Sequence, residues 1–185
     1  NGKKCFLVPS EIQKAAAEVE MPEEIPPGAI PTNAHWFSPP GFGITEYADL
    51  FTARQMQMLC TFSDLVRKAQ DMAASAALAA GMSETGGSLE AGGTGVGVYL
   101  AFVVDKMADY NSSMCSWRTA GGNIRSTFGR QAIPMVWTFA EGNPFSSVSG
   151  NFKTLLGSVA ESVEHLGCGS AVVVSQENAL SMEHP

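Results

Sequence analysis

The residues best suited to binding or chemistry gather between Tyr110 and Ala140, a stretch that we call the arginine strip. It contains no Asp or Glu, although the chain has 18 acidic residues. A guanidinium presents a fork of donors that suits phosphate, and aromatic rings offer stacking faces to extruded bases. The strip therefore predicts a DNA-facing surface. Its candidate contact residues are Arg118, Arg125, Arg130, Trp117, Phe128, Asn111 and Gln131.

A structural role for the same residues is the alternative. In that interpretation the three arginines form ion pairs with the chain's acids, while Trp117 and Phe128 fill the core. The two interpretations differ in whether these side chains are exposed.

Other candidate groups lack the context that a catalytic site needs. The glycine run 92–97 follows an expected helix rather than a strand, so it does not match a phosphate-binding loop. Asp105 and Asp109 lie one helical turn apart, and paired carboxylates can perform acid–base chemistry. No nucleophile or metal ligand accompanies them, so we expect a solvated or hydrogen-bonded structural role.

Histidine and cysteine spacing predicts no metal site. His35, His165 and His184 have no metal-ligand spacing, although His165 falls in the last turn of an expected helix, where it suits the dipole. The cysteines form no CxxC pair and lie more than 50 residues apart; they are Cys5, Cys60, Cys115 and Cys168. Free thiols fit a reducing cytoplasm.

Composition excludes further classes of protein. The formal net charge of -7 excludes a basic footprint spread over the whole chain, so DNA contact would need a local patch. The chain contains no run of 18 apolar residues, which predicts no membrane span. The chain starts at Asn1 without an initiator Met and ends at Pro185 without a tail signal, so both ends are expected to be cuts in a longer protein.

Periodic apolar residues predict the elements that position the strip. Helices are expected near 11–20, 52–80, 96–115, 133–141 and 150–166, with strands at 4–8 and 171–174. Thr52 and Gln55 form a capping-box pattern at the start of the longest helix. Ile133-Pro134 opens the fourth, because proline costs nothing at a first turn. The expected fold class is mainly α, or α+β at most, in one domain spanning 1–185.

The connecting segments also carry expectations. The segment 21–43 holds six of the ten prolines together with several aromatic residues, so we expect it to lie packed across a surface. Residues 83–95, rich in Gly, Ser and Thr, are expected to form a flexible loop. The strand at 171–174 cannot satisfy its own edge hydrogen bonds, which predicts a sheet outside this chain.

Three blocks of sequence resemble one family. The first is FTARQ at 51–55 with TFSDLV at 61–66, and the second is DYNSS at 109–113 with Trp117. The third is NIRSTFGRQAIPMVWTFAEGNPF at 123–145. Together they resemble the large adenine-specific DNA methylases that carry a zinc-ribbon segment, over roughly residues 31–185. Ala53 departs from the proline expected there, which touches no catalytic residue.

The resemblance implies a position inside a longer enzyme. In this family the glycine motif that binds S-adenosylmethionine lies upstream of the matched region, and the catalytic Asp-Pro-Pro-Tyr motif follows it. This chain has no Asp-Pro-Pro or Asn-Pro-Pro, and Asn143-Pro144-Phe145 follows an expected helix rather than a strand. No catalytic or cofactor-binding residue is therefore carried over. The strand at 171–174 would directly precede the catalytic strand.

We expect an internal region of a cytoplasmic, S-adenosylmethionine-dependent N6-adenine DNA methyltransferase of a restriction–modification type. It would assist DNA binding or support the catalytic domain, with DNA and that domain as partners, no membrane contact and no activity or cofactor of its own. One alternative is a structural spacer, which predicts that the three arginines are buried in ion pairs. Another is a protein-interaction module of a DNA-modification or phage-defence system, which predicts an exposed apolar patch in the proline-rich segment.

Overall fold

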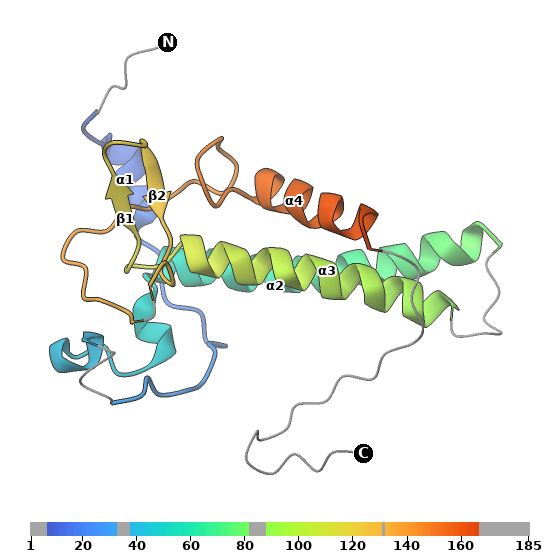
Figure 1. The fold of residues 1–185 in the computed structure, drawn as a ribbon, viewed down its shortest axis with the longest axis horizontal. Helices are drawn as coiled ribbons and strands as arrows, with labels where there is room; N and C mark the ends of the chain where they lie inside the picture. The colour runs from blue at the N-terminus through green and yellow to red at the C-terminus, as the bar shows by residue number, and fades with distance from the viewer. Residues whose placement is uncertain (1–6, 33–37, 82–87, 131, 167–185) are drawn as a thin grey trace.

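The structure is a computed structural model that describes residues 7–32, 38–81, 88–130 and 132–166. Two long antiparallel helices form its body: α2 (Ala53–Ala79) and α3 (Ser88–Tyr110) (Figure 1). Helix α4 (Phe152–Glu164) packs along α3. A hairpin of β1 (Ser116–Arg118) and β2 (Asn123–Arg125) lies where α3 ends, and the short α1 (Glu11–Ala17) meets the start of α2 through Arg54, which donates to Ala17 O. The expected mainly helical class, with little β structure, is confirmed.

Helix α2 begins as the capping pattern predicts. The Thr52 hydroxyl accepts from the Gln55 amide at 3.3 Å, and Gln55 Oε1 accepts from the Thr52 amide at 2.9 Å. Two of the N–H groups that lack a partner inside the helix are thereby satisfied. Its buried face repeats every three residues at Met56, Leu59 and Phe62.

Helix α3 begins at Ser88, eight residues before the expected start, so the loop expected over 83–95 is wrong from Ser88 onward. Two glycines there allow the helices to approach closely. A Cβ on Gly93 would lie 3.1 Å from Ala74 Cβ, and one on Gly97 would lie 2.9 Å from Gln70 Oε1. Glycines four apart share a helix face, so this run serves packing rather than a turn.

The same helix ends at Tyr110, five residues before the expected end. A buried turn follows at 111–115, and Ser113 donates through both its amide (2.7 Å) and its hydroxyl (2.8 Å) to Leu50 O. Leu50 closes the 3₁₀ helix Tyr47–Leu50; a second such helix covers Pro39–Phe42. The turn thus fixes the end of α3 against the segment that leads into α2.

The helix expected at 133–141 is absent, which corrects that prediction. Its backbone instead pairs with distant segments: Ser38 donates to Ile133 O at 3.4 Å, and Ala140 donates to Cys115 O at 2.9 Å. Met135 N also donates to Ser38 Oγ at 2.8 Å. Tertiary packing of a short apolar run therefore overrides the proline signal for a helix start.

The remaining boundaries differ in smaller ways. Helix α1 stops at Ala17 rather than 20, and α4 spans 152–164 within the expected 150–166. Leu7 and Val8 are exposed and do not form a strand, while residues 4–6 of that expected strand lie outside the described residues. The strand expected at 171–174 also lies outside them. The β1–β2 hairpin was not predicted.

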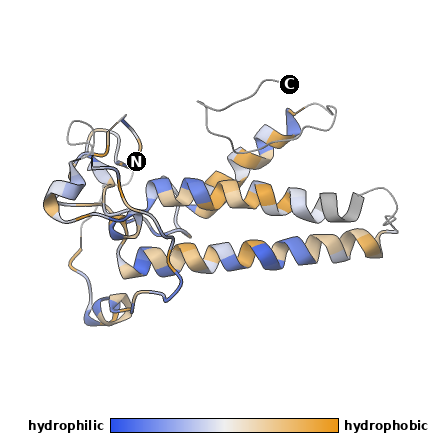
Figure 2. Ribbon diagram, turned by 90° about the horizontal axis from the view of Figure 1, so that it is seen from below, coloured by the Kyte–Doolittle hydropathy of each residue, from blue (hydrophilic) through white to orange (hydrophobic). Residues whose placement is uncertain are grey.

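The core has two clusters joined by Phe51, which packs against both. The first cluster consists of Ile30, Leu50, Met114 and Ile133. It joins the proline-rich segment, the 3₁₀ helix before α2, the turn after α3 and the segment 133–136. The second lies between the helices at Leu59, Phe62, Val103 and Met107. Apolar residues run along the two long helices in Figure 2. None of the helices in the described ranges is long and apolar enough to cross a bilayer.

Candidate nucleic-acid interface

The β1–β2 hairpin carries two of the three candidate arginines. Its strands pair Ser116 with Arg125, Trp117 with Ile124 and Arg118 with Asn123. Residues opposite each other in an antiparallel pair share a face, so Arg118 and Arg125 lie on one face as diagonal neighbours. Ile124, with Trp117 opposite it, is buried at 4 % exposure on the other face. The buried face anchors the hairpin while the arginine face remains outward.

The arginines of the strip are exposed. Arg118, Arg125 and Arg130 all have exposed side chains, and no described carboxylate forms an ion pair with any of them. Phe128 is 60 % exposed and Trp117 is 39 % exposed. The ion pairs that a purely structural role requires are therefore not found among the described residues. Gln131 lies outside those residues.

A small hollow joins two of the arginines. Arg125 and Arg130 both border a cavity of about 120 Å³, with Ser126 and Gly129 between them. Backbone and hydroxyl groups there supply further polar atoms beside the guanidinium groups. The lining suits an oxyanion, because two guanidinium groups and the Ser126 hydroxyl border the same small hollow.

Asp109 holds the backbone of the strip in place through hydrogen bonds. Because its carboxylate is already engaged by Lys106 and the Phe128 amide, the charge of Asp109 does not neutralise the arginines. Its carboxylate accepts from Lys106 Nζ at 2.9 Å and from the Phe128 amide at 3.0 Å. Its main-chain oxygen accepts from the Thr127 amide at 2.8 Å and the Thr127 hydroxyl at 2.7 Å. The hydrogen bond to Asp109 raises the pKa of Lys106. The expected structural role of Asp109 is thus confirmed, and Asp105 is exposed.

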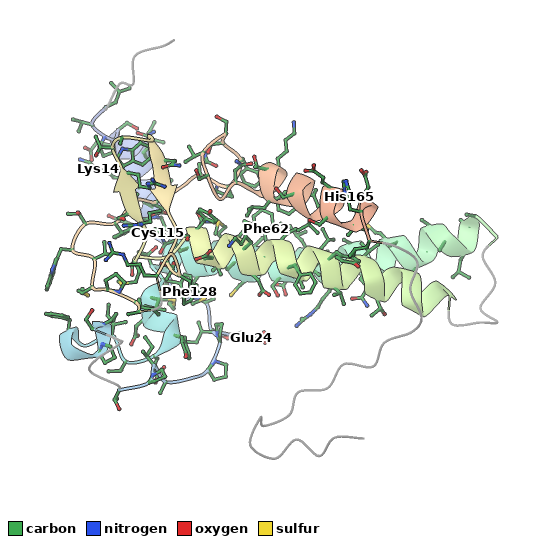
Figure 3. The ribbon with its side chains drawn as sticks, in the orientation of Figure 1. Lys14, Glu24, Phe62, Cys115, Phe128 and His165 are labelled. Carbon is green, nitrogen blue, oxygen red and sulfur yellow. The ribbon has the colours of Figure 1, made fainter. Side chains whose placement is uncertain are left out.

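A buried hydroxyl network continues this anchor. Ser112 Oγ lies 2.7 Å from Thr127 Oγ1 and accepts from the Met114 amide at 3.0 Å. The Cys115 thiol lies 3.7 Å from Ser112 Oγ and donates to Asp109 O at 3.4 Å. Figure 3 places Cys115 at the junction of the hairpin with α3, near Phe128. These buried polar groups are satisfied, so they fix one arrangement of the junction.

Asn111 does not share the exposed surface of the strip, which corrects its place in the expected DNA interface. It is 1 % exposed, and its Nδ2 donates to Met107 O at 2.8 Å and to Gly150 O at 3.4 Å. The residue follows the end of α3 directly and ties it to the approach to α4. Its polarity alone did not reveal this burial.

Replacing Thr127 by valine is expected to destabilise the chain by about 1–3 kcal/mol, because Ser112 loses its hydroxyl partner in a buried site. Thr61→Val is the matched control, since Thr61 is exposed and its hydroxyl bonds only to Gln57 O within its own helix. The control is expected to change stability by about 0.5 kcal/mol or less. Urea unfolding measures both free energies; equal losses would show that the network contributes nothing specific.

The other candidate groups are dispersed. His165 ends α4, and its Nδ1 lies 2.7 Å from Glu161 O; His35 and His184 fall outside the described residues. Burial raises the pKa of the half-buried Cys60 thiol, while Cys5 and Cys168 are outside those residues. Among the described residues, no three His, Cys, Asp or Glu side chains are grouped to hold a metal ion.

Sequence reasoning missed a pocket beside the start of α2. Arg54 and Glu141 form an ion pair with Nη2–Oε2 at 2.6 Å and Nε–Oε1 at 3.1 Å, and Arg54 Nη1 also donates to Ala17 O at 3.3 Å. The ion pair borders a cavity of about 320 Å³. Arg54 and Glu141 are 87 positions apart, so no local pattern announces their contact. Comparison with known protein families, with curated proteins and with solved structures found no match for this chain.

Proposed function

We propose that this chain is the DNA-contacting region of an adenine-specific DNA methyltransferase. The observation that carries the proposal is an exposed, acid-free arginine strip on a hairpin anchored by the Asp109–Thr127 hydrogen bonds. The planar guanidinium loses little freedom for each hydrogen bond that it makes to phosphate, and the anchored backbone beneath it is already ordered. The three sequence blocks that resemble the methylase family include β2 of this hairpin and both residues of its anchor.

In this proposal the arginines contact phosphates and the aromatic rings meet the bases. Arg125 and Arg130 share the small hollow, so one phosphate oxygen could accept from both. Arg118 lies diagonally across the hairpin from Arg125 and would meet a neighbouring phosphate. Phe128, 60 % exposed and fixed through its amide to Asp109, would stack on an extruded adenine, with Trp117 as a further support.

Methyl transfer itself would belong to other parts of the enzyme. The chain contains no Asp-Pro-Pro or Asn-Pro-Pro, so we assign it no catalytic residue and no S-adenosylmethionine contact through the family's motifs. The catalytic domain and DNA are its proposed partners. The chain would supply orientation and electrostatic attraction, and it would be inactive alone.

The test is the salt dependence of duplex-DNA binding by the complete natural protein. Arg125→Ala is expected to weaken binding to all sequences alike and to reduce the slope of log K against log salt by about one, since one phosphate contact is lost. Arg67→Ala is the matched control: Arg67 is exposed on α2, outside the strip. Equal slopes for the two variants would contradict a phosphate role for Arg125.

A protein-interaction module is the second candidate, favoured by exposed apolar residues around the proline-rich segment. Met21 is 45 % exposed and Ile25 is 39 % exposed. Phe42 (55 % exposed) meets Trp137 (75 % exposed) edge to face, with ring centroids 5.0 Å apart. A partner that buried these rings would be revealed if Phe42→Ala abolished complex formation and left DNA affinity unchanged.

A further inference from the structure

The pocket beside the start of α2 is built from two segments far apart in sequence. One wall comes from α2 with Gln55, Met58 and Phe62, and the other from Gly142, Pro144 and Phe145. Its volume of about 320 Å³ lies at the small end of the range for ligand sites, about 300–1,000 Å³. Figure 3 shows Phe62 between the long helices and α4. The pocket suits a single ring system rather than a large ligand.

Gln55 brings an unsatisfied donor to this pocket. The residue is 2 % exposed, and its Oε1 is held by the Thr52 amide at 2.9 Å. Its Nε2 is buried and has no hydrogen-bond partner. A buried amide nitrogen without a partner costs about 1–3 kcal/mol. Because the capping box fixes the orientation of the side-chain amide, an acceptor from a ligand would relieve this cost.

Asn111 brings an acceptor to the same pocket. Its Nδ2 is engaged by Met107 O and Gly150 O, and no described residue donates to its Oδ1. The Oδ1 lies close to Gly142, where a Cβ would come within 3.4 Å of it. Both residues line the pocket, so the Gln55 donor and the Asn111 acceptor lie beside its apolar side chains, with Gln57 and Thr61 as further polar lining residues.

The charge at the rim is neutralised within the protein. Arg54 and Glu141 pair through two contacts, at 2.6 and 3.1 Å, so the ligand need supply no charge. The aromatic walls are Phe62 and Phe145, whose ring centroids lie 6.0 Å apart at 37°. Phe145 is 82 % exposed, and the binding of a flat ring beside Phe62 would require the Phe145 ring to turn outward.

We propose that this pocket binds an adenine ring. Gln55 Nε2 donates to a ring nitrogen, and Asn111 Oδ1 accepts from the neighbouring exocyclic amino group. Side-chain amides read adenine through this pairing of an acceptor with an amino donor. The site is separate from the arginine strip, and it rests on the proposed function only in the choice of adenine over other amino-heterocycles.

The test is a nuclear magnetic resonance titration of the 15N-labelled chain that follows the side-chain amide signals of Gln55 and Asn111. Adenosine is expected to shift both signals. Purine riboside lacks the amino group and is expected to bind about 5- to 10-fold more weakly, the loss of one hydrogen bond. Two further titrations use S-adenosylmethionine and a single-stranded oligonucleotide that contains one adenine. The ligand that binds more tightly identifies which molecule supplies the adenine ring.

Two variants separate binding from folding. Gln55→Glu keeps the acceptor that caps α2 and removes the Nε2 donor, while Phe145→Ala removes an exposed ring that adds little to the core. Each is expected to weaken adenosine binding about 5- to 10-fold. Phe102→Ala, which removes an exposed ring of α3 outside the pocket, is the control and is expected to bind as the wild type does.

The proposal is overturned if millimolar adenosine leaves both amide signals in place. It is also overturned if purine riboside binds as well as adenosine, or if both pocket variants bind like the wild type. The arginine variants report on the proposed function separately. Loss of DNA affinity in those variants, together with an unresponsive pocket, would retain the interface and reject the adenine site.

Discussion

Changing Arg118, Arg125 and Arg130 together to alanine is expected to lower the affinity of the complete natural protein for duplex DNA on the order of 100-fold at about 0.1 M salt. Each arginine that neutralises a phosphate releases counterions on binding, so the slope of log K against log salt should fall by about three. Their exposure and lack of described ion pairs make the three changes tolerable for the fold. Fluorescence anisotropy with a labelled duplex at four salt concentrations measures both quantities.

The control for this experiment is a second triple variant, Arg67→Ala, Lys68→Ala and Lys153→Ala. These side chains are also exposed, but they lie on α2 and α4 rather than on the hairpin. Both triple variants lose three positive charges, so they have the same net charge. If the two lost affinity equally, binding would depend on overall charge alone, and the arginine strip would have no special role.

Local patterns in the sequence were sufficient to predict the existence of the two long helices and to single out the arginine strip, although not the bounds of α3 or the exposure of the strip. The capping box Thr52–Gln55 and the apolar repeat that follows it predict α2 almost to the residue. The absence of acids from 110–140 singled out the arginines as candidates, and their exposure follows from the structure rather than from the sequence. Both signals work because the interactions involved lie within one element or one short stretch.

The errors have a common physical origin in long-range contacts. Gly93 lies in the segment expected to form a loop, yet it packs against Ala74 of α2, and Gly97 one turn later packs against Gln70. Ile133 does not open the expected helix, because its carbonyl accepts from Ser38 and its side chain packs in the first core cluster. Propensity is a weak guide when a distant partner decides the outcome.

The pocket illustrates the same limit for function. The sequence identified Gln55 only as a capping residue, through its Oε1. It did not reveal that the Nε2 of the same side chain is buried without a hydrogen-bond partner. Asn111 was expected at the surface because of its polarity and is buried instead. Neither the Arg54–Glu141 ion pair nor the contact between Asn111 and Gly142 follows from spacing along the chain.

Gly150→Ala is expected to be the most damaging conservative change, with a loss of about 2–4 kcal/mol in the free energy of unfolding. Gly150 has φ +82°, in the left-handed region, which costs a residue with a Cβ about 1–2 kcal/mol. A Cβ there would also overlap Tyr110 Cβ and would lie 2.9 Å from Tyr110 Cγ. Tyr110 is the last residue of α3, so it cannot move without disturbing the Asn111 hydrogen bond to Gly150 O.

Alanine variants of two other glycines distinguish the cost of backbone strain from the cost of the close contact between an added Cβ and Tyr110. Gly43 has φ +89° but nothing within 4 Å of an added Cβ, so Gly43→Ala should cost only the strain, about 1–2 kcal/mol. Gly157 lies within α4 with open space around it, so Gly157→Ala should stabilise the chain by about 0.5–1 kcal/mol. Guanidinium unfolding ranks the three. A Gly150→Ala loss no larger than that of Gly43→Ala would mean that the contact with Tyr110 does not constrain the junction, and the arginine hairpin would lose one of its proposed supports.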